Sequence, residues 1–249
     1  FEGGHLVTQD NDMTSDWGEY RPETKIAVFN YNVHMVSPAP PQQARTTLLS
    51  DTLYYNTVTS VANVRGPSTI DDGGCHIYTE FGYMDSNNNN LTLLKRSEMS
   101  NNGKKLIGDS IVWNSVDSIG EAFGNILYTD ILSNNAMTGN YCYYNDKLGY
   151  TLGTDSACIM DFSQGADTLY MHADSIKMFT FNVKTDSAYR TMHAYNHVRM
   201  YRTDMQGVCD SLVYQTRDSM MIMYKDPILW TGSQQLLGEE IQAFMNDST

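Results

Sequence analysis

Acidic residues recur at one register along this chain, and their carboxylates are the first candidates for chemistry. Carboxylates act as general acids and bases, and rows of them can bind calcium. The GGxGxD signature of a calcium-binding repeat is absent from the sequence, however. Because each acid stands at the same place in its copy, we predict a strand bend where its side chain bonds nearby backbone. The eight positions, 29 to 36 residues apart, are Asp16, Asp51, Glu80, Asp109, Asn140, Asp174, Asp210 and Glu239.

Histidines and cysteines are the other candidates. His193 and His197 are four residues apart, and on a strand such residues lie about 13 Å apart, so we expect isolated histidines and no metal site. None of the four cysteines forms a CxxC pair, which gives no support to zinc or thioredoxin chemistry. Cys142 and Cys158 could face each other across one hairpin; the alternative is four small apolar strand residues. GxSxG, HExxH and P-loop motifs are also absent, so we expect neither an enzyme nor a cofactor.

Composition limits the function further. The chain has 249 residues, 41% of them hydrophobic and 18% charged, which is enough for a folded core. The net charge of −13 repels polyanions at long range, so we expect no nucleic-acid partner. The chain begins at Phe1, and we expect a single domain over residues 1–249 that is part of a longer protein.

The acids belong to a repeated strand motif. In Leu106–Asn114 an apolar lead-in precedes Asp109, and alternating side chains then end at Trp113. Similar stretches are Leu48–Asn56 and Val208–Gln215. Positions two and four after the acid share one face of a strand. They are mostly apolar, so we predict that this face is buried.

A second strand follows in each copy. About 15 residues after the acid comes a turn-like dipeptide, and an apolar strand follows it. The sixth copy has its dipeptide, Tyr195-Asn196, about six residues late, which we assign to a longer loop around Asn182 to Ser187. The other dipeptides are Tyr31-Asn32, Gly66-Pro67, Lys95-Arg96, Gly124-Asn125, Asp155-Ser156 and Lys225-Asp226.

These repeats predict an all-β fold. We expect about sixteen strands of roughly 5–7 residues, arranged as eight strand–turn–strand repeats that bury a core by stacking. The architecture would be an elongated antiparallel β-jelly roll, or an open two-sheet sandwich, with exposed end strands that can pair with other chains. Turns between the repeats are expected at Pro40-Pro41, Gly73-Gly74, Gln206-Gly207 and Gly232-Ser233, with a hairpin tip at Asn87–Asn90.

The apolar face leaves two alternatives. It is either a closed core or the lining of a groove for a long apolar ligand; large, flexible Met side chains suit varied apolar partners. The groove candidates are Leu53, Tyr55, Met84, Ile111, Trp113, Ile126, Tyr128, Ile176, Met178, Met200, Leu212, Tyr214, Ile228 and Trp230.

The pattern resembles the OstA/LptA-like family, in the branch with long β-rich repeats found in Bacteroidetes. The resemblance rests on the motif [LI]-x-[GSC]-D-[ST]-[LI]-x-[YW] at Asp51, Asp109 and, with Gly207 at its first position, Asp210. It rests also on a second-strand motif at Gly124-Asn125-Ile126, with relatives at Asn32-Val33 and Asn196-His197-Val198. It extends over essentially the whole chain.

This resemblance implies a non-enzymatic jelly roll in the periplasm, with outer-membrane association as a further expectation. Such proteins bind the acyl chains of lipopolysaccharide, or another acylated lipid, between their sheets. They pass the lipid between Lpt-type membrane components and associate edge to edge, so a homo-oligomer is expected too. The alternatives are a structural or protein-interaction β-solenoid with a closed core and, third, a polysaccharide-acting enzyme, which lacks an acid–base cluster here.

Overall fold

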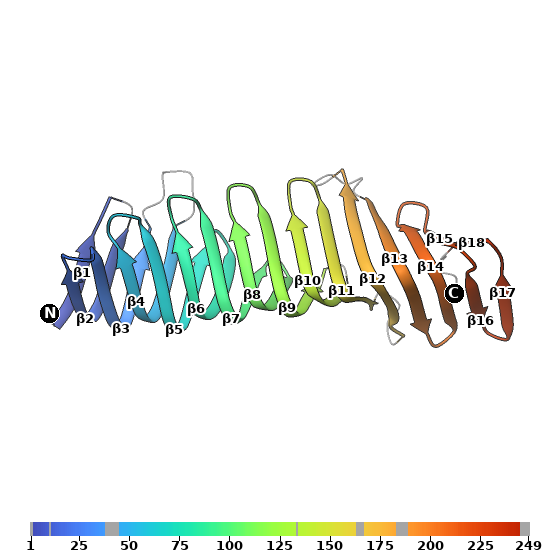
Figure 1. Ribbon diagram of the computed structural model, residues 1–249, viewed down its shortest axis with the longest axis horizontal. Helices are drawn as coiled ribbons and strands as arrows, with labels where there is room; N and C mark the ends of the chain where they lie inside the picture. Colours follow the sequence, from blue (N-terminus) through green and yellow to red (C-terminus); the bar gives the residue numbers. More distant parts are fainter. Residues whose placement is uncertain are drawn as a thin grey trace. The chain divides into compact units, whose positions relative to one another are not determined.

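The computed structural model describes residues 2–9, 11–37, 45–132, 134–162, 167–182 and 189–244. In these ranges the regular elements are 18 β-strands (Figure 1), which confirms the all-β prediction. Contacts divide the chain into two compact units, residues 1–116 and 117–249. The loops expected at Pro40-Pro41 and after Asn182 lie outside the described residues.

The first unit is an antiparallel meander in which each strand pairs with the next. A hairpin tip at residues 86–89 joins two of its strands, close to the predicted position. The strands are β1 (Glu2–Val7), β2 (Asp12–Arg21), β3 (Ile26–Val36), β4 (Thr46–Asn56), β5 (Val61–Asp72), β6 (Cys75–Asp85), β7 (Asn90–Asn101) and β8 (Lys104–Asn114).

The second unit continues the same pattern from β9 to β14. Strand β14 then pairs with both β15 and β16, and these pair with β18 and β17, respectively. The strands are β9 (Ile119–Asp130), β10 (Asn135–Asn145), β11 (Tyr150–Asp161), β12 (Leu169–Phe181), β13 (Tyr189–Arg202), β14 (Met205–Gln215), β15 (Met220–Tyr224), β16 (Ile228–Thr231), β17 (Gln234–Leu237) and β18 (Glu240–Phe244).

The predicted strand boundaries were wrong in a systematic way. Six of the seven dipeptides expected as turns lie inside continuous strands, and β2 to β14 have 10 to 14 residues each. At β3, for example, both Tyr31 and Asn32 have left-handed φ angles, 64° and 51°. Only Lys225-Asp226, where the chain divides into β15 and β16, separates two strands. The turn expected at Gln206-Gly207 also lies within a strand, β14.

These dipeptides are β-bulges. On β4, Thr52 pairs with Asn30 and Ser50 pairs with Val33, so the single residue Asp51 stands opposite Tyr31 and Asn32. Two residues opposite one bend a strand without ending it. In the sixth copy the left-handed pair is Asn196-His197, one residue later than predicted.

The bend changes which residues face inward. On β4 the buried positions are Leu48 and Ser50 before the acid, and Leu53 and Tyr55 after it. The alternation therefore shifts by one residue at Asp51, and both halves of the strand bury their apolar side chains. In each unit the bends fold the sheet into two facing layers (Figure 1).

Small side chains occupy the inside of many bends. In the first unit several are hydroxyls: Ser50 and Ser68 are hydrogen-bonded at 2.8 Å, as are Thr79 and Ser97. The Ser68 hydroxyl also donates to the carbonyl oxygen of Gly66 at 2.9 Å. A bulge interrupts the hydrogen-bond ladder, and these hydroxyls bond the carbonyl groups that it frees. In the second unit the corresponding positions include Ala157, Ala173 and Cys209.

Candidate functional site

The recurring acids lie on the outside of the bends and do not converge on a catalytic site. Six of the seven positions on continuous strands contact a bulge residue of a neighbouring strand. Their side chains thus bond across strands, whereas the sequence predicted bonds to nearby backbone. The contacts are Asp16–Asn32 at 2.7 Å, Glu80–Lys95 at 3.6 Å, Asp109–Arg96 at 3.0 Å, Asn140 with the backbone N–H of Asn125 at 3.3 Å, Asp174–His197 at 2.9 Å and Asp210–Lys225 at 2.8 Å.

The electrostatics agree with this pairing role. Hydrogen bonds from Lys225 and then Ser211 lower the pKa of Asp210 below its ordinary value. A carboxylate held in its charged form by a neighbouring ammonium is poorly suited to act as a general acid. Among the described residues, no group of three or more His, Cys, Asp or Glu side chains could hold a metal ion.

Most of the predicted groove residues line the interior. Leu53, Ile111, Ile176 and Leu212, each two positions after an acid, are 0–1% exposed. Half-buried are Met84, Trp113, Tyr128, Met178, Tyr214 and Ile228. Three further candidates are also buried: Tyr55, Ile126 and Met200.

Strand β16 differs from its predicted orientation. Leu229 is the buried residue, at 3% exposure, while Trp230 is 36% exposed. Lys225 and Asp226 have left-handed φ angles, and buried Pro227 follows them. The alternation of inward and outward side chains on β16 is therefore shifted by one residue from the predicted one. The structure therefore brings Leu229 into the interior and leaves Trp230 at the surface.

The two layers touch through these interior residues. A Cβ atom at Gly207 of β14 would lie 3.1 Å from the Met223 Cε atom of β15, in the facing layer. A Cβ atom at Gly153 of β11 would lie 2.8 Å from the Met137 sulfur of β10. Glycine at both places lets a flexible Met side chain fill the space between the layers. The interior of the second unit is thus apolar and closely packed at these points.

A polar contact bridges the two layers of the first unit. Asn11 is 1% exposed; its Nδ2 donates to the hydroxyl of Tyr55 at 3.2 Å, and its Oδ1 accepts from Ser37 at 2.8 Å. Tyr55 lies after the bend of β4, whereas Asn11 directly precedes β2. This contact fastens the layers together beside the interior.

Replacing Tyr55 with phenylalanine tests this contact. Because the Asn11 amide would lose a buried acceptor, we expect the free energy of unfolding to fall by about 1–3 kcal/mol. Urea denaturation of the two proteins measures the change. The matched variant Tyr83→Phe changes a tyrosine that is 38% exposed and should shift stability by less than about 0.5 kcal/mol. Equal stabilities for Tyr55→Phe and the parent protein would contradict the contact.

An ion pair bridges the layers of the second unit. Asp130, at the end of β9, is 3% exposed and lies 3.9 Å from the Arg190 guanidinium of β13. Tyr128 and Tyr144 lie close to this pair, and burial raises the pKa of Tyr128 to about 12. Burial, followed by the hydrogen bond to Asp146, also raises the pKa of Tyr144. A buried carboxylate is retained where a cation compensates it.

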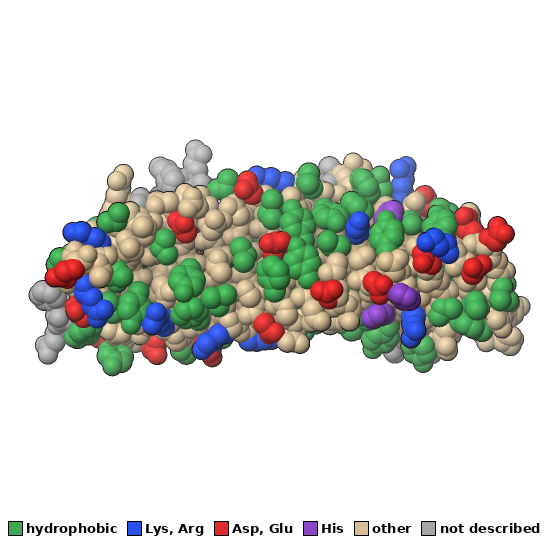
Figure 2. Space-filling model, viewed as in Figure 1, with side chains coloured by type: hydrophobic (Ala, Val, Ile, Leu, Met, Phe, Trp, Pro, Cys, Tyr) green, Lys and Arg blue, Asp and Glu red, His purple; other side chains and the backbone are tan. Residues whose placement is uncertain are grey.

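An aromatic strip on the outer face of the second unit was not predicted. Ring centroids lie 5.1 Å apart between Tyr150 and Phe179, and 4.9 Å apart between Phe181 and Tyr189. Figure 2 shows hydrophobic side chains gathered over β10 and β11. The aromatic residues occupy alternate positions that face away from the interior. This alternation of aromatic residues along the strands is the sequence pattern that could have predicted the strip.

The histidines and cysteines have structural roles. His197 bonds Asp174, and His193 packs edge-on against Phe179 with ring centroids 5.6 Å apart. Cys142 pairs across strands with Gly153, and Cys158 pairs with Thr138, so they do not face each other. All four cysteines are free thiols. Burial raises the pKa of Cys142 to about 12, which keeps this thiol protonated and unreactive.

One family model matches a part of the chain. Residues 1–41 match the family model of the OstA-like protein. The resemblance predicted from the repeats is confirmed over this segment, which contains β1 to β3. No curated protein matches the chain. No helix in the described ranges has the length and apolarity needed to cross a membrane.

Several solved structures match the chain. One of them is LptH of Pseudomonas aeruginosa, described as the LptA-homologous periplasmic component of the conserved lipopolysaccharide transport device. The identity is 17%, and the alignment covers 47% of this chain and 83% of that one, with a TM-score of 0.40.

Proposed function

We propose that this protein is a non-enzymatic periplasmic carrier that shields the acyl chains of lipopolysaccharide, or of another acylated lipid, between the two layers of its bent sheet. The observation that supports this best is the apolar interior repeated from strand to strand in both units, as at Ile111 and Leu212. The match of residues 1–41 to OstA-like proteins supports the lipid class.

Acyl chains would replace contacts that the layers make with each other. Each buried CH₂ group gains about 0.8 kcal/mol, so several chains can offset the separation of two apolar layers. The bulges are the natural hinges, because a bend with freed backbone groups changes its angle more easily than a regular ladder. Half-buried Trp113 and Tyr214 would contact the lipid first.

Partners would join through strand edges. In the described residues β1 pairs with β2 alone, so its other edge offers unpaired backbone groups. An added strand from a second copy, or from an Lpt-type membrane component, would extend the sheet. Association with the outer membrane would follow from such a contact.

Binding of purified protein to lipopolysaccharide tests this proposal. We expect saturable binding that weakens at least tenfold in Trp113→Glu, because a charge on the inner face opposes apolar burial. The control Tyr83→Glu places the same charge on an outward residue that is 38% exposed, and should bind as the parent does. Equal binding by both variants, or no binding by the parent, would contradict the proposal.

A second function class is favoured by one observation. The interior residues Leu53 and Leu212 are both 0% exposed, as in a closed core that serves a structural or protein-binding solenoid. Such a protein would bind its partner and leave lipopolysaccharide unbound in the same titration.

A further inference from the structure

One acid on the bends lacks the partner that the others have. Among the described residues, no hydrogen bond or ion pair reaches the side chain of Asp51, whereas the acids at the other continuous strands contact a donor on a neighbouring bulge. Two of these donors are cations: the Lys225 ammonium lies 2.8 Å from Asp210, and the Arg96 guanidinium lies 3.0 Å from Asp109. Asp51 is also exposed.

The residues on either side of Asp51 explain the difference. On β5 the bulge is Gly66-Pro67, which offers no side-chain donor. On β3 the Nδ2 of Asn32 donates to Asp16 of β2 at 2.7 Å, so this amide bonds the acid on its other side. The position that Lys or Arg fills in other copies is therefore vacant beside Asp51.

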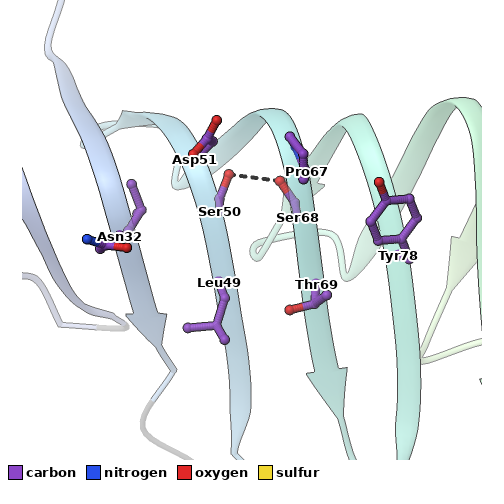
Figure 3. Close-up of a pocket in the computed structure, with 9 residues that line it drawn as sticks. Asn32, Leu49, Ser50, Asp51, Pro67, Ser68, Thr69 and Tyr78 are labelled. Carbon is purple, nitrogen blue, oxygen red and sulfur yellow. Dashed lines mark hydrogen bonds between the residues drawn. The ribbon is translucent and has the colours of Figure 1, made fainter.

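A hollow lies at this vacant position. It has a volume of about 330 Å³, and its lining includes Asn32, Leu49, Asp51, Pro67 and Tyr78. Leu49 is 50% exposed and Tyr78 42% exposed, so apolar and aromatic surface stands beside a carboxylate. Figure 3 shows Asp51 and Pro67 at the bend, with Leu49 and Tyr78 extending from β4 and β6, and the Ser50–Ser68 hydrogen bond between the neighbouring strands.

We propose that this hollow binds a basic side chain, arginine or lysine, of a partner polypeptide. The charged group pairs with Asp51, as Arg96 pairs with Asp109, and its aliphatic stem lies on Leu49 and Pro67. The ring of Tyr78 adds a face for the cation. The net charge of −13 draws basic segments to the chain at long range. This site lies outside the bends and is independent of lipid binding.

Titration of the ¹⁵N-labelled chain with N-acetyl-arginine amide tests the site. Saturable shift changes are expected at residues 49–51, 67–69 and 78. The neutral isostere N-acetyl-citrulline amide should bind at least fivefold more weakly, because it lacks the charge that Asp51 recognises.

Two variants and one control complete the test. Asp51→Asn should weaken arginine binding at least fivefold, and Pro67→Arg should abolish it by supplying the missing donor from within the chain. Asp109→Asn removes an acid that already has Arg96 as its partner and should leave binding unchanged. Equal binding of the two probes, an unaffected Asp51→Asn, or no saturable shift would each overturn the proposal.

Discussion

Replacing Leu212 with alanine should lower the free energy of unfolding of the second unit by about 2–5 kcal/mol. Leu212 is 0% exposed and belongs to a buried cluster that includes Ile176, Ala194, Met221 and Met223. The substitution removes three buried carbon atoms and leaves a cavity that the strands on either side can close only in part. Urea denaturation, with hydrogen exchange reporting on β9 to β18, measures the loss.

Leu148 supplies the matched control for this substitution. It is 71% exposed in the turn between β10 and β11, so Leu148→Ala should change stability by less than about 0.5 kcal/mol. A loss below about 1 kcal/mol for Leu212→Ala would mean that the layers of this unit are loosely packed in solution.

Replacing Gly66 with alanine should destabilise the first unit by about 2–6 kcal/mol, for two reasons that add. Gly66 has a φ of +85°, a region that costs other residues about 1–3 kcal/mol. A Cβ atom there would also lie 3.0 Å from the Cβ atom of Asp51, and overpacking costs about 1–3 kcal/mol. Denaturation followed by tryptophan fluorescence measures the effect, since Trp17 and Trp113 both lie in the first unit.

Gly74 separates these two contributions. Its φ is +90°, and no atom lies within 4 Å of the Cβ that alanine would add. Gly74→Ala should therefore cost about 1–3 kcal/mol, the conformational part alone. If the two variants were equally stable, the contact between Gly66 and Asp51 would contribute nothing to the bend.

The repeat and the buried stripe were predictable because they depend on short-range pattern. A strand alternates with period two, so Leu53 and Ile111 could be placed inside from their distance to the preceding acid. The bulges were not predictable in the same way. Dipeptides such as Gly124-Asn125 have the composition of a turn, and only cross-strand pairing shows that the ladder resumes after them.

The partners of the acids depend on a neighbouring strand. Asp109 bonds a residue 13 positions earlier, whereas Asp174 bonds one 23 positions later. The prediction that each acid bonds nearby backbone was therefore wrong, because it considered only neighbours in the sequence. Once this pairing is known, the sequence also predicts that Asp51 has no partner on β5, because neither Gly66 nor Pro67 has a polar side chain. Trp230 was misplaced for a related reason: its strand follows a bulge.

Site-specific crosslinking in cells shows whether the interior binds lipid. A photo-crosslinking amino acid at Trp113, which is half-buried on the inner face of β8, should capture lipopolysaccharide upon illumination. The same group at Tyr83, which faces outward and is 38% exposed, should capture none. Capture at Tyr83 but not at Trp113, or at neither position in folded protein, would contradict lipid binding between the layers.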